Sequence, residues 1–341
     1  AFSRIKKFHL KQKFFSFKYR DKFKNELEYK YSPLRKVGVY VPGGIASYPS
    51  TVLMNCIPAL VAGVKDIYLS TPAFGSKINP AIVYAAKKCG VKKIYKTGGA
   101  HTIAALAYGT NKFEKVDKIV GPGNIYVSYA KKKVFGEVGI DMIAGPSEIT
   151  VVGDKNSNPK WIAADLIAQA EHDINSQCIL ISKDFKLIKN VKRFIKEQIN
   201  ILPRKKIAKE SLKKNGLFIY SSSNKKIIEI VNLIAPEHLE LNLKNNNKIA
   251  KQIKNAGSIC VGKYSAMAAT DYNVGSNHIL PTNSSAKFSS GLSVYDFYKR
   301  ISVINLSKKG IETIGEQVIK LANYEGLVGH ARSVEVRIRR K

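Results

Sequence analysis

The feature that most constrains the fold is a regular alternation of short apolar runs, Gly-rich turns and helical segments. The run Val37–Val41 ends at Pro42-Gly43-Gly44, and a helical segment from Ser50 to Gly63 follows it. Three further units repeat this order. Their expected strands are 66–70, 93–95 and 118–120, and these are followed in turn by expected helices at 79–89, at 101–108 and, after the turn at 121–124, as far as residue 135. Strands that alternate with helices in this way predict a parallel sheet covered by helices.

The alternation starts again after Gly145-Pro146-Ser147-Glu148. Strands are expected at 148–152, 178–182, 217–220 and 258–261, with a long amphipathic helix at 187–202. After Ser289 the alternation stops, and we expect helices at 294–299 and 309–324 and a basic, strand-like end at 334–338. We therefore predict an α/β protein with two Rossmann-like parallel-sheet lobes, helices on both faces of each sheet, and a C-terminal helical and strand tail.

The chain is accordingly expected to divide into four segments. Residues 1–36 form a basic N-terminal segment that is expected to pack on the second lobe. The first lobe is expected at 37–147, the second lobe at 148–289 and the tail at 290–341. About fifty residues are too few for an independent core, so the tail is expected to pack on another surface.

Composition narrows the possible partners. The net charge of +32 invites a nucleic-acid interpretation, but the excess is mostly lysine spread along the whole chain, with no DNA- or RNA-binding motif. We therefore predict no specific nucleic-acid partner. No apolar run approaches the length of a membrane span, so no membrane partner is predicted. The four cysteines contain no CxxC pair, which favours reduced thiols in a cytoplasmic protein and disfavours a cysteine-built zinc site.

A helix around residues 163–172 carries the first candidate site. Asn158 can cap this helix and Pro159 fits its first turn. Gln169 and His172 are three residues apart and therefore lie on one face. An amide oxygen and an imidazole there could form half of a metal site, or they could be ordinary polar residues on a solvated face. Further oxygen and nitrogen donors suited to zinc occur at Asp271 and His330.

Two further patterns allow two interpretations each. Glu237 and His238 could act on one substrate from a loop as separate bases, or they could be a helix-end histidine beside an exposed glutamate. The turns at 42–44, 98–99, 121–124 and 145–147 could let the backbone approach a nucleotide, or they could be plain turns. None of them has the spacing of a GxGxxG or Walker loop.

From about Val37 to the C-terminus the sequence resembles the histidinol dehydrogenase family, because it contains four of the family's motifs in the family's order. They are Gly121-Pro122-Gly123-Asn124, Gly145-Pro146-Ser147-Glu148, Gln169-Ala170-Glu171-His172 and Pro236-Glu237-His238-Leu239. The resemblance implies oxidation of L-histidinol to L-histidine through histidinal, the last steps of histidine biosynthesis. It also implies two NAD+ and one zinc ion per reaction site in a homodimer with shared active sites. The first lobe would then be the cofactor side, the second would carry the metal and the catalytic bases, and the tail would serve dimerisation.

Carried over by motif, the resemblance assigns roles to individual residues. The implied zinc ligands are Gln169, His172, Asp271 and His330, with His330 contributed by the partner subunit. The implied catalytic bases are His238, for the hydroxyl proton, and Glu237, for water. Implied substrate contacts are Ser147 and Glu325 together with the zinc ligands and His238, and implied cofactor contacts are Tyr40, His101 and Asn124.

The chain departs from the family pattern at a few positions. His101 stands where the family usually has glutamine, and Met267 and Thr270 replace an acidic residue and a glycine before Asp271. The N-terminal region is also shorter than in typical members. The rival hypotheses are a related metal-dependent amino-alcohol dehydrogenase and a non-enzymatic basic paralogue that binds polyanions.

Overall fold

The computed structural model describes residues 1–12, 14, 16–43, 47–73, 75 and 77–338. It forms two compact units, Ala1–Gln12 with Leu34–Phe297 and Lys13–Pro33 with Tyr298–Lys341. The turn expected at Pro42-Gly43-Gly44 is described as far as Gly43, and Gly44 lies outside the described residues.

The first lobe of the larger unit is a five-stranded sheet in which every neighbouring pair is parallel, in the order β5-β4-β3-β6-β7. Its strands are β3 (Lys36–Tyr40), β4 (Asp66–Ser70), β5 (Lys93–Tyr95), β6 (Lys118–Val120) and β7 (Gly139–Ile140). Its helices are α2 (Pro49–Ala62), α3 (Pro80–Lys88), α4 (Ala100–Tyr108) and α5 (Ile125–Val134). Helix α2 packs with α3, and α4 packs with α5, as expected if each pair covers one face.

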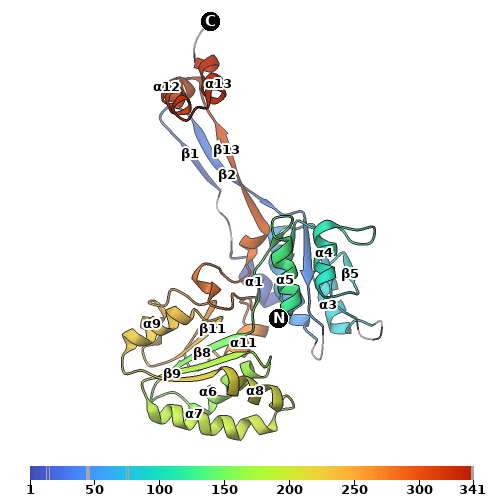
Figure 1. The fold of residues 1–341 in the computed structure, drawn as a ribbon, viewed down its shortest axis with the longest axis vertical. Helices are drawn as coiled ribbons and strands as arrows, with labels where there is room; N and C mark the ends of the chain where they lie inside the picture. The colour runs from blue at the N-terminus through green and yellow to red at the C-terminus, as the bar shows by residue number, and fades with distance from the viewer. Residues whose placement is uncertain (13, 15, 44–46, 74, 76, 339–341) are drawn as a thin grey trace. The chain divides into compact units, whose positions relative to one another are not determined.

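The second lobe repeats this topology, in the order β10-β9-β8-β11-β12 (Figure 1). Its strands are β8 (Glu148–Gly153), β9 (Gln177–Ser182), β10 (Gly216–Tyr220), β11 (His238–Asn242) and β12 (Ser258–Val261). Its helices are α6 (Pro159–Ala170), α7 (Phe185–Gln198), α8 (Lys205–Asn215), α9 (Asn224–Ile234), α10 (Asn246–Ala250) and α11 (Met267–Tyr272), with a 3-10 turn η1 (Ile199–Ile201) after α7. In both lobes the first strand in sequence is central, and the chain changes direction between it and the fourth strand.

Alternate residues of the second sheet enter two different hydrophobic clusters. Ile149, Val151 and Leu180 pack with side chains of α6 and α7, such as Leu166 and Val191. Val152, Ile179 and Leu239 pack with Ile227 and Val231 of α9. Because successive side chains of a strand point to opposite faces, both faces are covered by helices. The predicted fold class is confirmed.

The smaller unit is an antiparallel sheet in the order β1-β2-β13 followed by two helices (Figure 1). Its elements are β1 (Phe17–Arg20), β2 (Glu26–Pro33), β13 (Tyr298–Asn305), α12 (Lys308–Tyr324) and α13 (Val328–Ile338). The two helices pack on each other through Ile319, Ala322 and Ala331.

The structure corrects several expectations for the two ends of the chain. The helix expected at 294–299 is a short 3-10 turn, η3 (Val294–Phe297), followed directly by β13. The strand expected at 334–338 is the end of α13. Both errors have one cause: β13 forms by pairing with β2, far away in the sequence, which leaves α13 to pack on α12.

The chain also does not divide at 36/37 and 289/290. The expected segment 1–36 is split: residues 13–33 belong to the smaller unit, while α1 (Phe2–His9) packs against α2 of the first lobe. The Arg4 carbonyl of α1 also lies close to Gly275, beside the second lobe. Another 3-10 turn, η2 (Ser285–Lys287), lies between α11 and η3. No helix among the described residues is long and apolar enough to cross a membrane.

Candidate functional site

A cavity of about 780 Å³ is lined by residues of both lobes of the larger unit. The first lobe contributes residues that follow the carboxyl ends of its strands, such as Pro42 and Asn124. The second lobe contributes the opposite edge of its sheet, since Ser147 precedes β8, Asn175 precedes β9 and Glu237 precedes β11. The volume is typical of a small-molecule site.

The helix α6 brings the predicted zinc ligands Gln169 and His172 to this cavity. It forms as predicted: the Asn158 side chain accepts hydrogen bonds from the N–H groups of Lys160 and Trp161, and Pro159 occupies the first turn. The helix ends at Ala170, so His172 lies just beyond it and is exposed, whereas Gln169 is only 1% exposed. The burial of Gln169 therefore excludes the interpretation that this residue lies on a solvated face of the helix.

Asp271 reaches the cavity from α11. Burial raises the pKa of its carboxyl group to about 7. Its Oδ1 atom is buried without a hydrogen-bond partner among the described residues. A buried carboxylate oxygen with no donor is costly unless a cation or proton satisfies it. Its chemistry therefore fits a metal, although no group of three His, Cys, Asp or Glu side chains in the described part of the chain is arranged as a metal site.

Glu237 and His238 are both buried and line the cavity. His238 is the first residue of β11, which corrects the expectation of a loop, and the burial of Glu237 excludes an exposed glutamate. The His238 Nε2 atom lies 3.7 Å from Glu237 Oε1 and 3.9 Å from Asp271 Oδ1. Burial, helped by the nearby His278 and His172, lowers the pKa of His238 to about 3. The imidazole is therefore neutral near pH 7, and one of its ring nitrogens carries a free lone pair.

Glu148 is a residue of this site that the sequence analysis did not select. The backbone N–H of Glu148 donates to Glu237 Oε2 at 2.8 Å, and the Glu148 carboxyl group accepts from the N–H of Glu237 at 3.4 Å and of Asn283 at 3.0 Å. Burial raises the pKa of Glu237 well above the usual range of a glutamate. The position of Glu148 directly after Ser147 in a recognised motif was the available signal.

His278 is the second omission. It lines the cavity, and its Nδ1 atom lies 2.8 Å from the Asp271 carbonyl oxygen. The chain has six histidines, and three of them, His172, His238 and His278, line this one cavity. The rarity of histidine in the sequence was the signal for this residue.

The three predicted cofactor residues lie at the carboxyl edge of the first sheet, but in different surroundings. Asn124 lines the cavity and caps α5 by accepting a hydrogen bond from the N–H of Val127. Tyr40 is buried in the core, with its hydroxyl accepting the N–H of Gly99 at 3.0 Å. His101 is exposed on α4, with its Nε2 atom 3.1 Å from Thr97 Oγ1. Tyr40 and His101 therefore both contact the turn at 97–99, and neither lines the cavity.

The remaining predicted contacts are divided between the two units. Ser147 lines the cavity and is half-buried. Glu325 is the C-cap residue of α12 and His330 lies on α13, so both belong to the smaller unit, and both are exposed.

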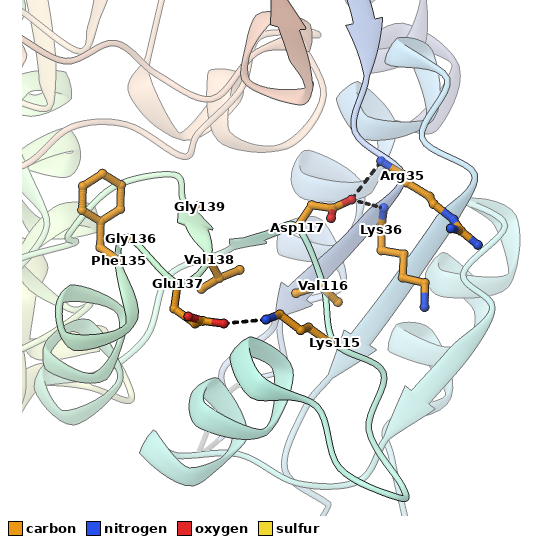
Figure 2. A pocket seen from close by; sticks show the side chains of 10 residues that line it. All are labelled: Arg35, Lys36, Lys115, Val116, Asp117, Phe135, Gly136, Glu137, Val138 and Gly139. Atoms are coloured by element: carbon orange, nitrogen blue, oxygen red, sulfur yellow. Dashed lines mark hydrogen bonds and ion pairs between the residues drawn. The ribbon is translucent and has the colours of Figure 1, made fainter.

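A second cavity, of about 560 Å³, lies at the amino edge of the first sheet (Figure 2). Both of its carboxylates are bonded: that of Asp117 accepts the backbone N–H groups of Arg35 and Lys36 at 3.0 and 2.8 Å, and that of Glu137 pairs with Lys115 at 2.5 Å. None of the predicted site residues lies there. These charges hold the strand ends together.

The fold and the larger cavity define a class of protein. It is an α/β enzyme of two Rossmann-like lobes, with a neutral buried histidine and buried carboxyl groups available for acid–base chemistry on a small molecule.

Known proteins specify the class further. Residues 1–338 match the family model described as histidinol dehydrogenase. A histidinol dehydrogenase of Pelagibacter ubique is 66% identical over 342 residues, covering 100% of this chain and 80% of the relative. The crystal structure of histidinol dehydrogenase from Elizabethkingia anophelis has a TM-score of 0.95 and 43% identity, covering 99% of this chain and 78% of that one. The chain belongs to the histidinol dehydrogenase family, and it is an oxidoreductase of histidine biosynthesis.

The fold itself extends to other proteins. A propionaldehyde dehydrogenase from Clostridium phytofermentans has a TM-score of 0.54 with 13% identity, covering 88% of this chain and 83% of that chain. At this identity the likeness concerns the arrangement of the lobes alone.

Proposed function

We propose that the chain catalyses the zinc-dependent, NAD-linked, four-electron oxidation of L-histidinol to L-histidine through histidinal. The observation that carries the proposal is the meeting of Glu237, His238 and Asp271 at one cavity, where His238 Nδ1 and Asp271 Oδ1 are buried without partners among the described residues. Such atoms indicate a bound ligand or ion that completes their bonding.

Gln169, His172 and Asp271 would hold the zinc ion from this larger unit, and His330 would be the fourth ligand. A zinc ion held by these residues would supply a template for orienting the substrate. Ser147 and Glu325 would contact the substrate. The mixed oxygen and nitrogen donors suit this metal.

His238 would accept the hydroxyl proton in each oxidation. Its imidazole is neutral near pH 7 because burial lowers its pKa to about 3, so it begins with a free nitrogen lone pair. Bound NAD+ would accept the hydride in both steps, held at the carboxyl edge of the first sheet with Tyr40, His101 and Asn124 as contacts. The first oxidation therefore leaves histidinal, one hydride on the cofactor and one proton on the protein.

Glu237 would act between the two oxidations. Its carboxylate would take a proton from water as the water oxygen attacks the aldehyde carbon, and the hydrate would then lose its hydride and a hydroxyl proton. The N–H of Glu148 holds the Glu237 carboxyl group at the cavity wall, and the backbone N–H of Glu237 donates to the Glu148 carboxyl group in return. Its raised pKa makes it a stronger base than an exposed glutamate.

The proposal includes a homodimer with shared active sites that works in the cytoplasm, without a specific nucleic-acid or membrane partner. The four free cysteines, all buried, suit a reducing compartment. In domain terms, residues 37–147 would bind the cofactor, residues 148–289 would carry the metal and the bases, and residues 290–341 would contribute to the dimer.

The direct test is to mix the protein, zinc, NAD+ and L-histidinol and to follow NADH absorbance until the reaction ends. Four-electron oxidation yields two NADH for each histidinol. A yield of one would contradict the second step, and turnover only with another amino alcohol would support the first rival. No turnover with histidinol or with another amino alcohol would support the second rival, a non-enzymatic basic paralogue that binds polyanions.

Site sharing is tested with two inactive variants, Glu237→Gln and His330→Asn, unfolded together and refolded as mixed dimers. If His330 acts across the interface, one site of each heterodimer carries both defects and the other carries none, so the mixture regains about a quarter of the wild-type activity. An inactive mixture that contains proven heterodimers would contradict sharing.

A further inference from the structure

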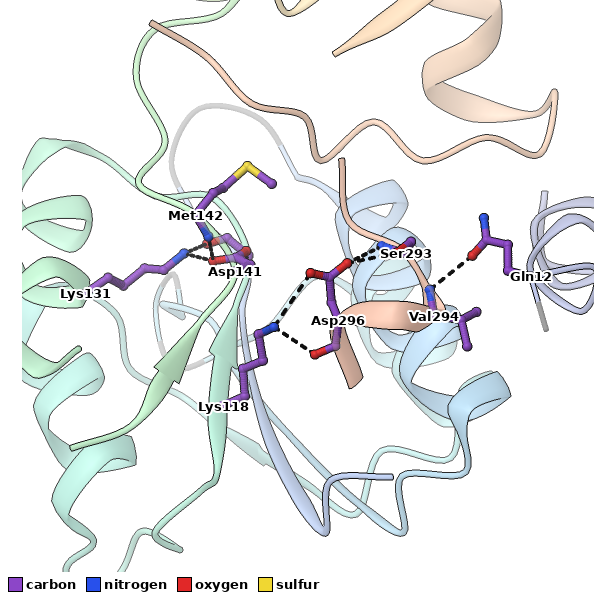
Figure 3. Close-up of polar contacts among 9 residues, drawn as sticks. Gln12, Lys118, Lys131, Asp141, Met142, Ser293, Val294 and Asp296 are labelled. Atoms are coloured by element: carbon purple, nitrogen blue, oxygen red, sulfur yellow. Dashed lines mark hydrogen bonds and ion pairs between the residues drawn. The ribbon is translucent and has the colours of Figure 1, made fainter. Parts of the chain in front are cut away.

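The first lobe contains a buried ion pair that the proposed chemistry does not use. Lys131 lies on α5 and Asp141 follows β7, and their side chains are 2% and 1% exposed. Figure 3 shows the two side chains meeting. Removing two charges from water is costly, and an apolar pair of similar volume is often as stable. Stability alone therefore does not explain why this pair is present.

The pair binds the backbone of a single residue, Gly121. Lys131 Nζ donates to the Gly121 carbonyl oxygen at 3.0 Å, and Asp141 Oδ2 accepts the Gly121 N–H at 2.7 Å. Gly121 has a φ of +112°, and a Cβ atom there would lie 2.0 Å from the Tyr40 carbonyl oxygen. Only glycine fits this close passage over the end of β3. The ion pair binds both the N–H and the carbonyl group of Gly121, and it therefore fixes the position of this backbone.

The same pair also reaches a second loop. Asp141 Oδ1 accepts the N–H of Met142 at 2.7 Å, and the chain then runs into residues 143–147, which line the large cavity. Residues 122–124, which follow Gly121, line it too. Ser128 on α5 adds one more tie, because its hydroxyl donates to the Ala144 carbonyl oxygen at 2.9 Å. One buried pair thus anchors two of the loops that line the cavity on its first-lobe side.

We propose that Lys131 and Asp141 are positioning residues that set the two first-lobe loops for the bound dinucleotide. This inference rests on the proposed function for the identity of the ligand. The role of the pair in fixing the two loops rests only on its hydrogen bonds to Gly121 and Met142. Neither side chain lines the cavity, so they act through the backbone of Gly121 and Met142.

Lys118 provides a matched control in the same lobe. Its Nζ atom also binds a backbone carbonyl and a carboxylate, those of Asp296, at 2.7 and 3.7 Å (Figure 3). Asp296 belongs to η3, which does not line the cavity. Lys118→Met therefore removes a comparable lysine without touching the two loops.

The experiment compares the double variant Lys131→Met/Asp141→Asn with Lys118→Met and with wild type. Removing both charges together avoids leaving a lone buried charge. We expect the KM for NAD+ to rise about tenfold or more in the double variant, while the KM for histidinol and the zinc content change by less than about twofold. Lys118→Met should change none of these. Ser128→Ala removes the hydrogen bond to Ala144 and a hydroxyl that lines the cavity, and it should give a smaller rise in the same direction.

Hydrogen–deuterium exchange supplies a readout that needs no activity. Peptides covering 121–124 and 142–147 should exchange faster in the double variant, and in Ser128→Ala for 142–147 alone, but not in Lys118→Met. Unchanged exchange at both loops in folded variants overturns the positioning role, as does an equal rise of both KM values. If the double variant does not fold, Ser128→Ala decides between these outcomes. A wild-type protein without NAD-linked turnover overturns the proposed function, and the exchange result still judges the loops.

Discussion

The two lobes share one strand order but present opposite edges to the same cavity. The first lobe presents the carboxyl ends of its strands, where open α/β sheets usually bind ligands. The second lobe presents amino ends, with Glu237 and His238 at the start of β11. Topology therefore does not decide which edge carries the chemistry. An edge that carries the chemistry differs from one that does not in whether its buried polar groups already have hydrogen-bond partners.

The two amino edges illustrate this difference. At the first, the Asp117 carboxylate accepts two backbone N–H groups and Glu137 pairs with Lys115 (Figure 2). At the second, His238 Nδ1 and Asp271 Oδ1 are buried without partners among the described residues. Satisfied groups stabilise a fold, whereas unsatisfied ones require a ligand or a proton.

The largest expected effect comes from removing the base at the second amino edge. His238→Asn should lower kcat for histidinol oxidation by about 10³-fold, because a proton leaves oxygen in both hydride steps. The matched change at the first amino edge, Asp117→Asn, should leave kcat within about twofold and cost about 1 kcal/mol of stability. Steady-state kinetics and urea unfolding measure the two. Similar losses of activity in both variants would remove the distinction between the edges.

The next effect separates the two bases of the second lobe. Glu237→Gln should slow histidinol oxidation by about 10²-fold, because water must be activated after the aldehyde forms. Reduction of supplied histidinal by NADH should suffer much less, since it needs no water. His238→Asn should damage both directions. Equal losses in both directions for Glu237→Gln would give Glu237 a different role.

Metal dependence tests the unsatisfied carboxylate directly. Chelator treatment should abolish activity and added Zn2+ should restore it. Asp271→Asn should weaken zinc binding by more than the roughly 10–100-fold typical of losing an outer-sphere partner. Competition with a chromogenic chelator measures the affinity, and Asp117→Asn serves as the control. Full activity of a verified metal-free sample would contradict the proposal.

The smallest effect concerns the charges buried within each lobe. In the first, Lys131 and Asp141 balance each other, whereas in the second, burial and the nearby Asp165 raise the pKa of Glu240 from 4.5 to about 8. The folded state therefore binds more protons than the unfolded state between these values. The free energy of unfolding should fall as pH rises through this window, by at most about 1.4 kcal/mol per pH unit for this one group.

Glu240→Gln should reduce this slope, since the amide does not titrate, while Glu237 and Asp271, whose pKa values burial also raises, keep part of it. Urea unfolding at several pH values from 4.5 to 8.5 measures the slopes of wild type and variant. The Lys118→Met variant should keep the wild-type slope. Parallel curves for wild type and Glu240→Gln would show that Glu240 does not titrate in this way.

Several details of the site were beyond prediction from single motifs. The Glu237 carboxyl group is held by a backbone N–H from a residue 89 positions away, and Glu148 returns a contact over the same separation. Asn283 is added from a third segment. Such contacts arise only when strands β8 and β11 become neighbours, which a local pattern does not specify.

The sequence by itself determined the α/β class, the start of α6 and several residues that line the cavity, such as Gln169, His238 and Asp271. These features depend on short-range physics: the apolar period of a strand or helix, the Asn158 cap and the turn-forming glycines. Only the tertiary structure decided that β13 pairs with β2, that the second lobe presents its amino edge, and that burial lowers the pKa of His238. Those outcomes depend on burial and on contacts between distant segments, because the protonation and bonding of a group are set by its neighbours in space.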